Sequence, residues 1–362
     1  MRYFAYCRKS SEGEERQALS IPAQIDEIKR AFGESPEFQI VEWFEEKMSA
    51  KAPERIVYLN ACDPWQMFGY NPLRRVREDK IPLAVAGLLE TLKKIWPDAW
   101  GVRMEHVLRN AIYALLEREG STLPDILRLF TDEDYRKEVV RGIRNDVVKR
   151  YWREEFEHYP ARLRAEACAP IQNKLGALLA NPTLHRILVK PEIDLHFRKL
   201  MDEGTILLVN VSKGRLGEEC SLLLGSLVVS TLGLAAFSRA EANPAERQPY
   251  FVYLDEFHNF TTLMLANMMS ELRKYGLGLV LAHQYLQQLE PDIRHAVLGN
   301  AGTIVSFRVG PEDATLIADE LQPIFGVLDI LGLPNRSIYL KLMIDGSPSK
   351  PFSATIMSIE AL

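Results

Sequence analysis

A stretch of 19 residues without a charged side chain, residues 220–238, constrains the fold of this 362-residue chain more than any other feature. Its length is nominally sufficient to cross a lipid bilayer. Serine, threonine and glycine dilute it, however, and strand-like segments flank it closely. We therefore predict a buried core helix and expect no transmembrane segment, with a membrane span as the alternative.

The composition places the chain among globular proteins. Apolar residues make up 47% and charged residues 26%, which excludes a disordered, collagen-like or disulfide-scaffold protein. The net charge is −5, so any DNA contact would have to be local. Four cysteines lie far apart without a CxxC pair, and no apolar signal region follows the N-terminus. These features argue against a zinc site and predict a cytoplasmic protein.

The apolar pattern divides the chain into four parts. Residues 1–55 show the order strand, loop, helix, strand of a short βαβ fragment, and residues 56–77 begin an α/β core. Residues 78–200 are predicted to be helical throughout, and residues 201–362 return to α/β alternation. The strands expected in this last part are residues 205–211, 250–254, 279–282 and 302–309, and a final hairpin of residues 337–344 and 352–357.

One strand ends in a pair of acidic residues. Four apolar residues, 251–254, precede Asp255 and Glu256, which is the form of a Walker B strand. In such a strand the first carboxylate orders Mg²⁺ through water, and the second polarises the water that attacks ATP. The next strand predicted to be buried ends in His283 and Gln284. RecA-like motors, which have a similar Walker B strand, carry a polar sensor of the γ-phosphate at this position.

These strings resemble the conjugative coupling proteins of TraG/TraD type and the HerA/FtsK-like DNA-pumping ATPases. Residues 206–217, 271–276 and 300–310 and the helical block strengthen the resemblance. It implies a RecA-like (P-loop NTPase) sheet core with an all-helical inserted domain at residues 78–200. It also implies ATP and Mg²⁺ as cofactors, and as partners DNA, a hexameric ring of copies and membrane-anchored or secretion-system proteins.

The same resemblance implies roles for individual residues. Asp255 would bind the metal, Glu256 would be the catalytic base, and Gln284 would be the sensor. Either Arg273 or Arg308 would act in trans across the ring interface, with a surface salt bridge as the alternative for each.

The phosphate-binding loop of that family is missing from the sequence. A P-loop needs Gly-Lys followed by Ser or Thr, so that backbone amides and the lysine cradle the phosphates. None of the 21 glycines is followed by lysine. The glycine-rich segment 212–217 follows a predicted strand, but it lacks the spacing and the Lys-Ser/Thr pair. The sequence therefore predicts an ATPase domain that is catalytically defective.

The N-terminal segment resembles a different family. Residues 6–10, 16–24 and 48–55 are similar to the start of the serine recombinases of the resolvase/invertase family. The resemblance implies that Ser10 is the nucleophile that attacks DNA. The residues that would hold the scissile phosphate are Arg8, Gln24 and Arg55. The later arginines, the dimerising helix and the DNA-binding tail of that family have no counterpart here.

Two expectations follow from this combination. The function predicted first is a DNA-translocating ATPase domain of conjugative coupling type. The alternatives are a serine recombinase acting through a 5′-phosphoserine, and a non-catalytic remnant or assembly artefact. For the fold, we expect the strand at residues 2–6 to lie in or against the sheet that contains residues 250–254, with loop 8–17 near Asp255; a detached βαβ flap is the alternative.

Overall fold

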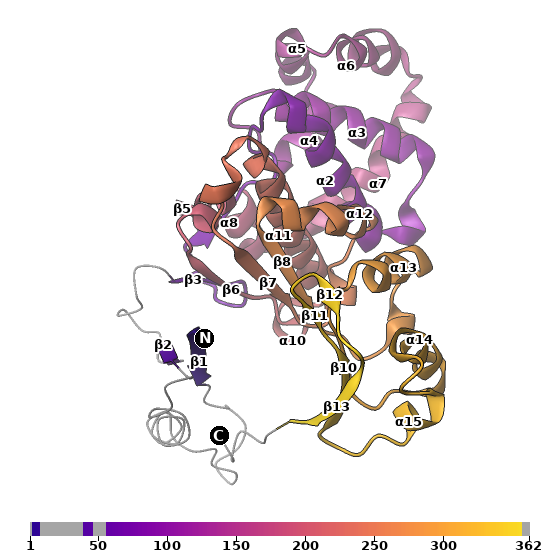
Figure 1. The fold of residues 1–362 in the computed structure, drawn as a ribbon. Coiled ribbons are helices and arrows are strands. Elements are labelled where there is room, and N and C mark those ends of the chain that lie inside the picture. Colours follow the sequence, from indigo (N-terminus) through magenta and orange to yellow (C-terminus); the bar gives the residue numbers. More distant parts are fainter. Residues whose placement is uncertain (1, 8–38, 46–55, 357–362) are drawn as a thin grey trace. The chain divides into compact units, whose positions relative to one another are not determined.

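The computed structural model describes the backbone of residues 2–7, 39–45 and 56–356 (Figure 1). The chain divides into two compact units, one of residues 55–301 and one that combines residues 1–54 with residues 302–362. The larger unit has the predicted α/β architecture, with parallel strand pairs, a central helix and a block of helices. The predicted domain limits at residues 77/78 and 200/201 stay predictions.

The helical block is formed where it was predicted. Its helices are α2 (Ile81–Ile95), α3 (Val102–Leu116), α4 (Leu123–Thr131), α5 (Glu133–Gly142), α6 (Asp146–Arg150), α7 (Ala161–Leu179), α8 (Pro182–Leu188) and α9 (Phe197–Asp202). In α3, Val107, Leu108 and Ala111 recur at helical spacing and are buried. A capping box of Thr122 and Asp125 starts α4. Local sequence signals therefore account for this block.

The uncharged stretch forms the central helix α11 (Glu218–Phe237), as predicted. By length and hydropathy, Glu218–Glu241 could cross a membrane, but 67% of its most apolar window is buried inside the protein. It packs against α2, α9 and α12 (Leu263–Leu272), and Figure 1 shows it beside α2 and α12. Its close packing requires glycine at Gly225, where an added Cβ would lie 2.2 Å from Cδ1 of Phe260.

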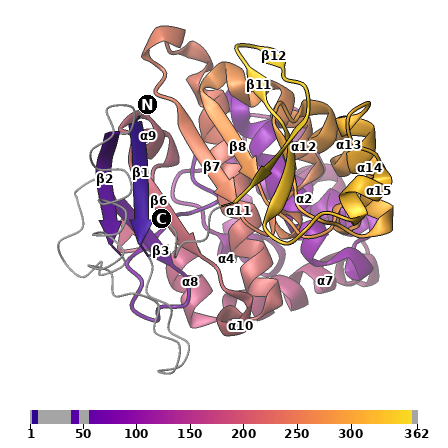
Figure 2. The same cartoon turned by 60° about the horizontal axis from the view of Figure 1, so that its bottom comes forward.

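Four strands of the larger unit form two parallel pairs. Strand β3 (Ile56–Asn60) pairs with β6 (Ile206–Asn210), and β7 (Tyr250–Leu254) pairs with β8 (Leu277–Leu281). Strands β7 and β8 lie side by side in both Figure 1 and Figure 2. The carboxyl ends of each pair therefore meet at one edge, because the strands of a pair run in the same direction. The short strands β4 (Phe68–Gly69) and β5 (Ile193–Asp194) also pair in parallel.

The remaining elements follow in chain order. They are α10 (Lys213–Leu216), α13 (Pro291–Asn300), β9 (Ile304–Ser306), α14 (Pro311–Leu321), α15 (Val327–Leu331), β10 (Ser337–Lys341), β11 (Met343–Ile344), β12 (Ser347–Pro348) and β13 (Phe352–Thr355). The predicted hairpin is confirmed, since β10 pairs antiparallel with β13, and β11 pairs with β12. Asp345 and Gly346 both have positive φ in its turn, which favours Asp-Gly at a tight hairpin.

The N-terminal strand does not join the sheet of the larger unit, contrary to our expectation. Strand β1 (Arg2–Cys7) pairs in parallel with β2 (Gln39–Glu45). Among the described residues it pairs with no strand after residue 200, and β7 has β8 as its partner. Strand β1 is therefore paired with β2, and β7 is paired with β8. The loop expected near Asp255, residues 8–17, lies outside the described residues.

A buried arginine connects the helical block to the starts of β7 and β8. The Arg239 side chain is fully buried, and its Nε donates to Oδ1 of Asp202, at the end of α9, over 3.0 Å. Its Nη1 donates to the carbonyl oxygens of Gln248 (2.9 Å) and Tyr275 (3.2 Å). Burial lowers the pKa of Arg239, and Asp202 opposes that effect. One guanidinium group therefore satisfies acceptors from three separate segments.

Replacing this arginine should destabilise the fold. Arg239→Met removes a fully buried cation and its hydrogen bonds to Asp202, Gln248 and Tyr275, while Asp202 keeps Arg198 as a partner, which should cost about 1–3 kcal/mol of unfolding free energy. Urea unfolding measures the change. Arg103→Met is the matched control, because the Arg103 side chain is 72% exposed and should contribute little. Equal unfolding midpoints for the two variants would contradict this role for Arg239.

Candidate functional site

The turn after β7 holds the two acidic residues that the sequence indicates. The Glu256 N–H donates to Oδ1 of Asp255 (3.0 Å), and Glu256 adopts the left-handed conformation at φ 47°. This conformation is costly for a residue other than glycine and persists where surrounding bonds enforce it. Here the Phe257 N–H donates to the carbonyl of Ala282 (3.1 Å), and the Ala282 N–H donates to that of Leu254 (2.9 Å). The end of β8 therefore fixes the acidic turn.

The residue predicted to be a sensor lies against the residue predicted to be the base. The register pairs Leu254 with Leu281, so the residues after both strands meet at the same edge. Gln284 Nε2 donates to Oε1 of Glu256 over 2.6 Å. The structure thus brings Glu256 and Gln284 together, while their predicted catalytic roles stay predictions.

His258, which the sequence analysis did not single out, lies on the other side of the same carboxylate. Its Nδ1 is 3.4 Å from Oε2 of Glu256, and its side chain is 17% exposed. Burial lowers the pKa of His258 below its usual value, and Glu256 opposes the shift. Glu256 is therefore flanked by an imidazole whose charged form is disfavoured by burial. His283 packs edge-on against Phe257, with ring centroids 4.8 Å apart.

The glycine-rich segment after β6 reaches this turn through Lys213. Its Nζ donates to Oδ1 of Asn259 (2.7 Å) and lies 3.4 Å from Oε1 of Glu218. Asn259 Nδ2 in turn donates to the backbone carbonyl of Glu256 (3.0 Å). The sequence places Lys213 in a glycine-rich loop after a strand. The sequence pattern does not show that this lysine contacts Asn259, because that contact joins two segments far apart in the chain.

A second lysine holds the turn from the helical block. Lys94, near the end of α2, donates to the carbonyl oxygens of His258 (2.7 Å) and Thr261 (2.6 Å). Burial lowers the pKa of Lys94 to about 8; Glu290 opposes the shift and Lys213 adds to it. Sequence analysis missed Lys94, because a lysine near the end of an amphipathic helix carries no signal for a contact so far along the chain.

Within residues 56–301, no contact brings Arg273 to this turn. Arg273 is exposed in the single turn that follows α12. Arg308 belongs to the smaller unit, where it donates to Oδ1 of Asn335 (3.1 Å). The structure therefore does not choose between the two arginines. The recombinase-like residues lie outside the described part of the chain: Arg8, Ser10, Gln24 and Arg55.

These residues fit the part of a site for ATP and Mg²⁺ that would hold the metal and the attacking water. Asp255 offers a carboxylate for a metal, and Glu256 and Gln284 could orient a water molecule. Within the described residues, no group of three or more His, Cys, Asp or Glu could hold a metal without further ligands. Lys94 and Lys213 are engaged by protein oxygens, and no Gly-Lys-Ser/Thr occurs in the sequence. The phosphate half does not fit, so we derive no hydrolytic step.

The parallel pair of β7 and β8 carries an acidic turn after one strand and a glutamine after the next, in an α/β fold that also contains a block of helices. Residues 249–321 match the family described as the TraM recognition site of TraD and TraG. That segment contains Asp255, Glu256 and Gln284. The comparison with curated protein sequences gives no match.

Solved structures with a similar fold include the bacterial conjugative coupling protein TrwB and VirB4. The unbound conjugative coupling protein TrwB is 13% identical, with a TM-score of 0.55 over 84% of this chain and 74% of that one. The TrwB complex with ADP and Mg²⁺ is 14% identical, with a TM-score of 0.57 over the same shares. VirB4 of Thermoanaerobacter pseudethanolicus is also 14% identical, with a TM-score of 0.52 over 83% and 76%. The chain therefore has a coupling-protein-like fold.

The buried Lys94 should make stability depend on pH. Its pKa is about 8 in the folded protein against 10.5 without burial, so the unfolded chain binds more protons between these values. The unfolding free energy should therefore rise as pH increases from 8 to 10.5, by at most about 3 kcal/mol. The neutral amine still has two N–H groups for its two carbonyl partners, so the contact survives deprotonation.

The measurement is urea unfolding at pH 7.5, 9 and 10.5 for three proteins. Lys94→Met should lack the increase, whereas Lys93→Met, which changes an exposed neighbour, should keep it. If Lys94→Met rises with pH as steeply as the unmodified chain does, Lys94 is not the group responsible.

Proposed function

We propose that this chain is the ATPase domain of a DNA translocase of the conjugative coupling type and that it is catalytically defective. The observation that supports this most directly is the hydrogen bond between Gln284 and Glu256 at the ends of adjacent parallel strands. It lies within the segment that matches the TraD and TraG family, and the surrounding fold resembles TrwB.

The ligands and partners proposed for the chain follow from these similarities. TrwB has been solved with ADP and Mg²⁺ and with analogues of GTP and ATP, so a nucleotide and Mg²⁺ are the ligands of the ancestral site. DNA, a ring of identical copies and a secretion-system protein are the proposed partners. The matched family is described as a TraM recognition site, which makes a TraM-like protein one candidate. The proposed location is the cytoplasm.

The defect follows from what the site lacks. Phosphoryl transfer depends almost entirely on positioning and on charge that stabilises the phosphates in the transition state. Glu256 can orient water, yet the described residues offer no cradle of backbone amides and lysine for the phosphates. Preorganised groups of this kind are each worth several kcal/mol, and 1.36 kcal/mol corresponds to tenfold in rate.

ATP hydrolysis tests the proposal. The purified chain should hydrolyse ATP no faster than its Glu256→Gln variant, with or without DNA and Mg²⁺, in a phosphate-release assay. Gln284→Ala serves as a second comparison, because it removes the proposed sensor and leaves the acids in place. A rate that DNA and Mg²⁺ stimulate and that Glu256→Gln abolishes would show that the domain is an active ATPase.

The alternative of a serine recombinase is supported by the N-terminal sequence strings alone. Ser10 should form no covalent bond with DNA, because the chain lacks the family's later arginines and its dimerising helix. The measurement uses a nicked suicide substrate, followed by denaturing electrophoresis of the whole chain and of Ser10→Ala. An adduct that forms with the whole chain and disappears in Ser10→Ala would refute this prediction.

A further inference from the structure

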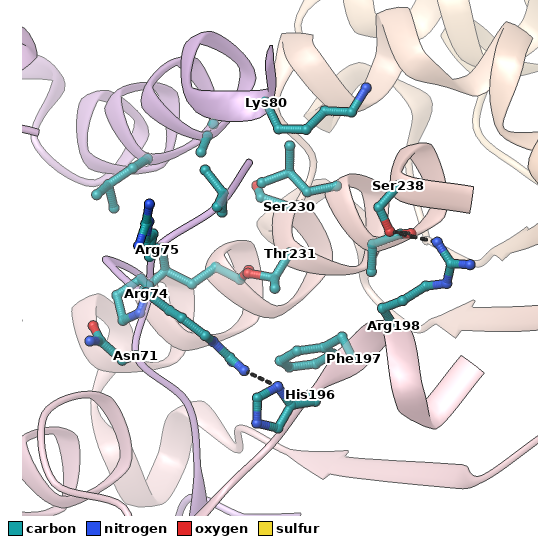
Figure 3. A pocket seen from close by; sticks show the side chains of 18 of the residues that line it. Asn71, Arg74, Arg75, Lys80, His196, Phe197, Arg198, Ser230, Thr231 and Ser238 are labelled. Carbon is teal, nitrogen blue, oxygen red and sulfur yellow. Dashed lines mark hydrogen bonds between the residues drawn. The ribbon is translucent and has the colours of Figure 1, made fainter. Parts of the chain in front are cut away.

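A pocket of about 260 Å³ lies between α2 and the second half of α11, apart from the acidic turn. Its walls are mostly apolar and include Ala84 and Leu88 of α2 and Leu227 and Leu234 of α11. Phe197, at the start of α9, also lines it (Figure 3). Figure 3 shows Arg74 and Arg75 on one side, Arg198 on the other, Lys80 above, and Ser230 and Thr231 of α11 between them. The pocket is therefore apolar inside and basic around its rim.

The rim carries cations without acidic residues of its own. Among the described residues that line the pocket, five are Arg or Lys and none is Asp or Glu. Four of these cations have partners nearby: Arg74 contacts His196 Nδ1 (2.6 Å), Arg198 donates to Ser238 Oγ (3.0 Å), and Arg77 and Lys80 pair with Asp79.

Arg75 differs from these four cations. It is exposed, and within residues 56–356 no ion pair or hydrogen bond engages its guanidinium group. It is therefore the rim cation free to bind an anion.

A hydroxyl group that is open to the pocket gives a second feature of the site. Ser230 is 7% exposed and lines the pocket, and no hydrogen bond engages its Oγ within residues 56–356. The oxygen is not among the fully buried unpaired atoms of this part of the chain, so a molecule in the pocket can reach it. The neighbouring Thr231 satisfies its own hydroxyl by donating to the carbonyl of Leu227 (2.7 Å). An oxygen atom of a bound molecule would satisfy Ser230.

We propose that this pocket binds a single-chain amphiphile with an anionic head group, such as an acyl carboxylate or an alkyl phosphate. The apolar walls contributed by α2 and α11 receive the chain, because they exclude water from it. Arg75 binds the head group through a charge-assisted hydrogen bond, and Ser230 donates to one of its oxygens. This site is independent of the proposed nucleotide chemistry, since none of its residues belongs to the acidic turn.

The experiment is calorimetric titration of the whole chain with decanoate, decyl phosphate, decanol and acetate, each below the concentration at which micelles form. Decanoate and decyl phosphate should bind, decanol should bind at least tenfold more weakly, and acetate should give no heat of binding. The comparison of decanoate with decyl phosphate shows which head group the rim prefers. Equal affinity for decanol and decanoate, or no binding by either anion, would overturn the proposal.

Two variants locate the site. Arg75→Gln should weaken decanoate about tenfold and leave decanol unchanged, because it removes the head-group charge alone. Ala84→Leu should abolish binding of both by filling the apolar interior. Arg103→Gln, an exposed arginine on α3 outside the pocket, is the matched control and should bind like the unmodified chain. Unchanged decanoate affinity in Arg75→Gln would refute the proposed head-group contact even if Ala84→Leu failed to fold.

Discussion

The burial of a helix without charges is the constraint around which the larger unit is built. Because α11 exposes apolar side chains in all directions, it is stable in water when other elements cover it, and α2, α9 and α12 do so. The packing also reaches the candidate site. Phe260 lies against Gly225 with no room for a Cβ, and Phe260 immediately follows the single turn that begins at Phe257. The core helix therefore helps to position the residues that follow Glu256.

The acidic turn is held by contacts from distant parts of the chain. Glu256 occupies a left-handed conformation that a glutamate avoids when it is free. The turn is enforced by hydrogen bonds from Lys94 of α2 and by the strand pairing with β8, and Gln284 and His258 flank its carboxylate. A strained backbone in such a frame is typical of functional sites. These contacts join α2, β7 and β8, so they support the fold of the larger unit as well as the turn.

Sequence patterns predicted the elements that are determined by residues close together in the chain. The uncharged run, the helical spacing of α3, the Asp-Gly turn and the strand ending at Asp255 each depend on residues close together in the chain, and all of these elements were found. The contact of Gln284 with Glu256 depends on the parallel pairing of β7 with β8, which brings the residues after both strands to one edge. The contacts of Lys94 and Lys213 could not be predicted from the sequence, because they depend on how distant elements pack. The expected partner of the N-terminal strand was wrong for the same reason: an edge strand carries no local signal for its neighbour.

The exposed face of β7 links the missing cradle to the fold. Parallel strands are normally covered by helices on both faces, and the apolar run of β7 has that character. Yet Phe251 and Tyr253 are 60% and 73% exposed, and Val280, the neighbour of Tyr253 in β8, is 43% exposed. Under the proposed function, the phosphate-binding amides would belong to a strand–loop–helix unit, and a helix packed on this face would cover these aromatic side chains. The proposed defect and the exposure of Phe251 and Tyr253 would then have one physical explanation.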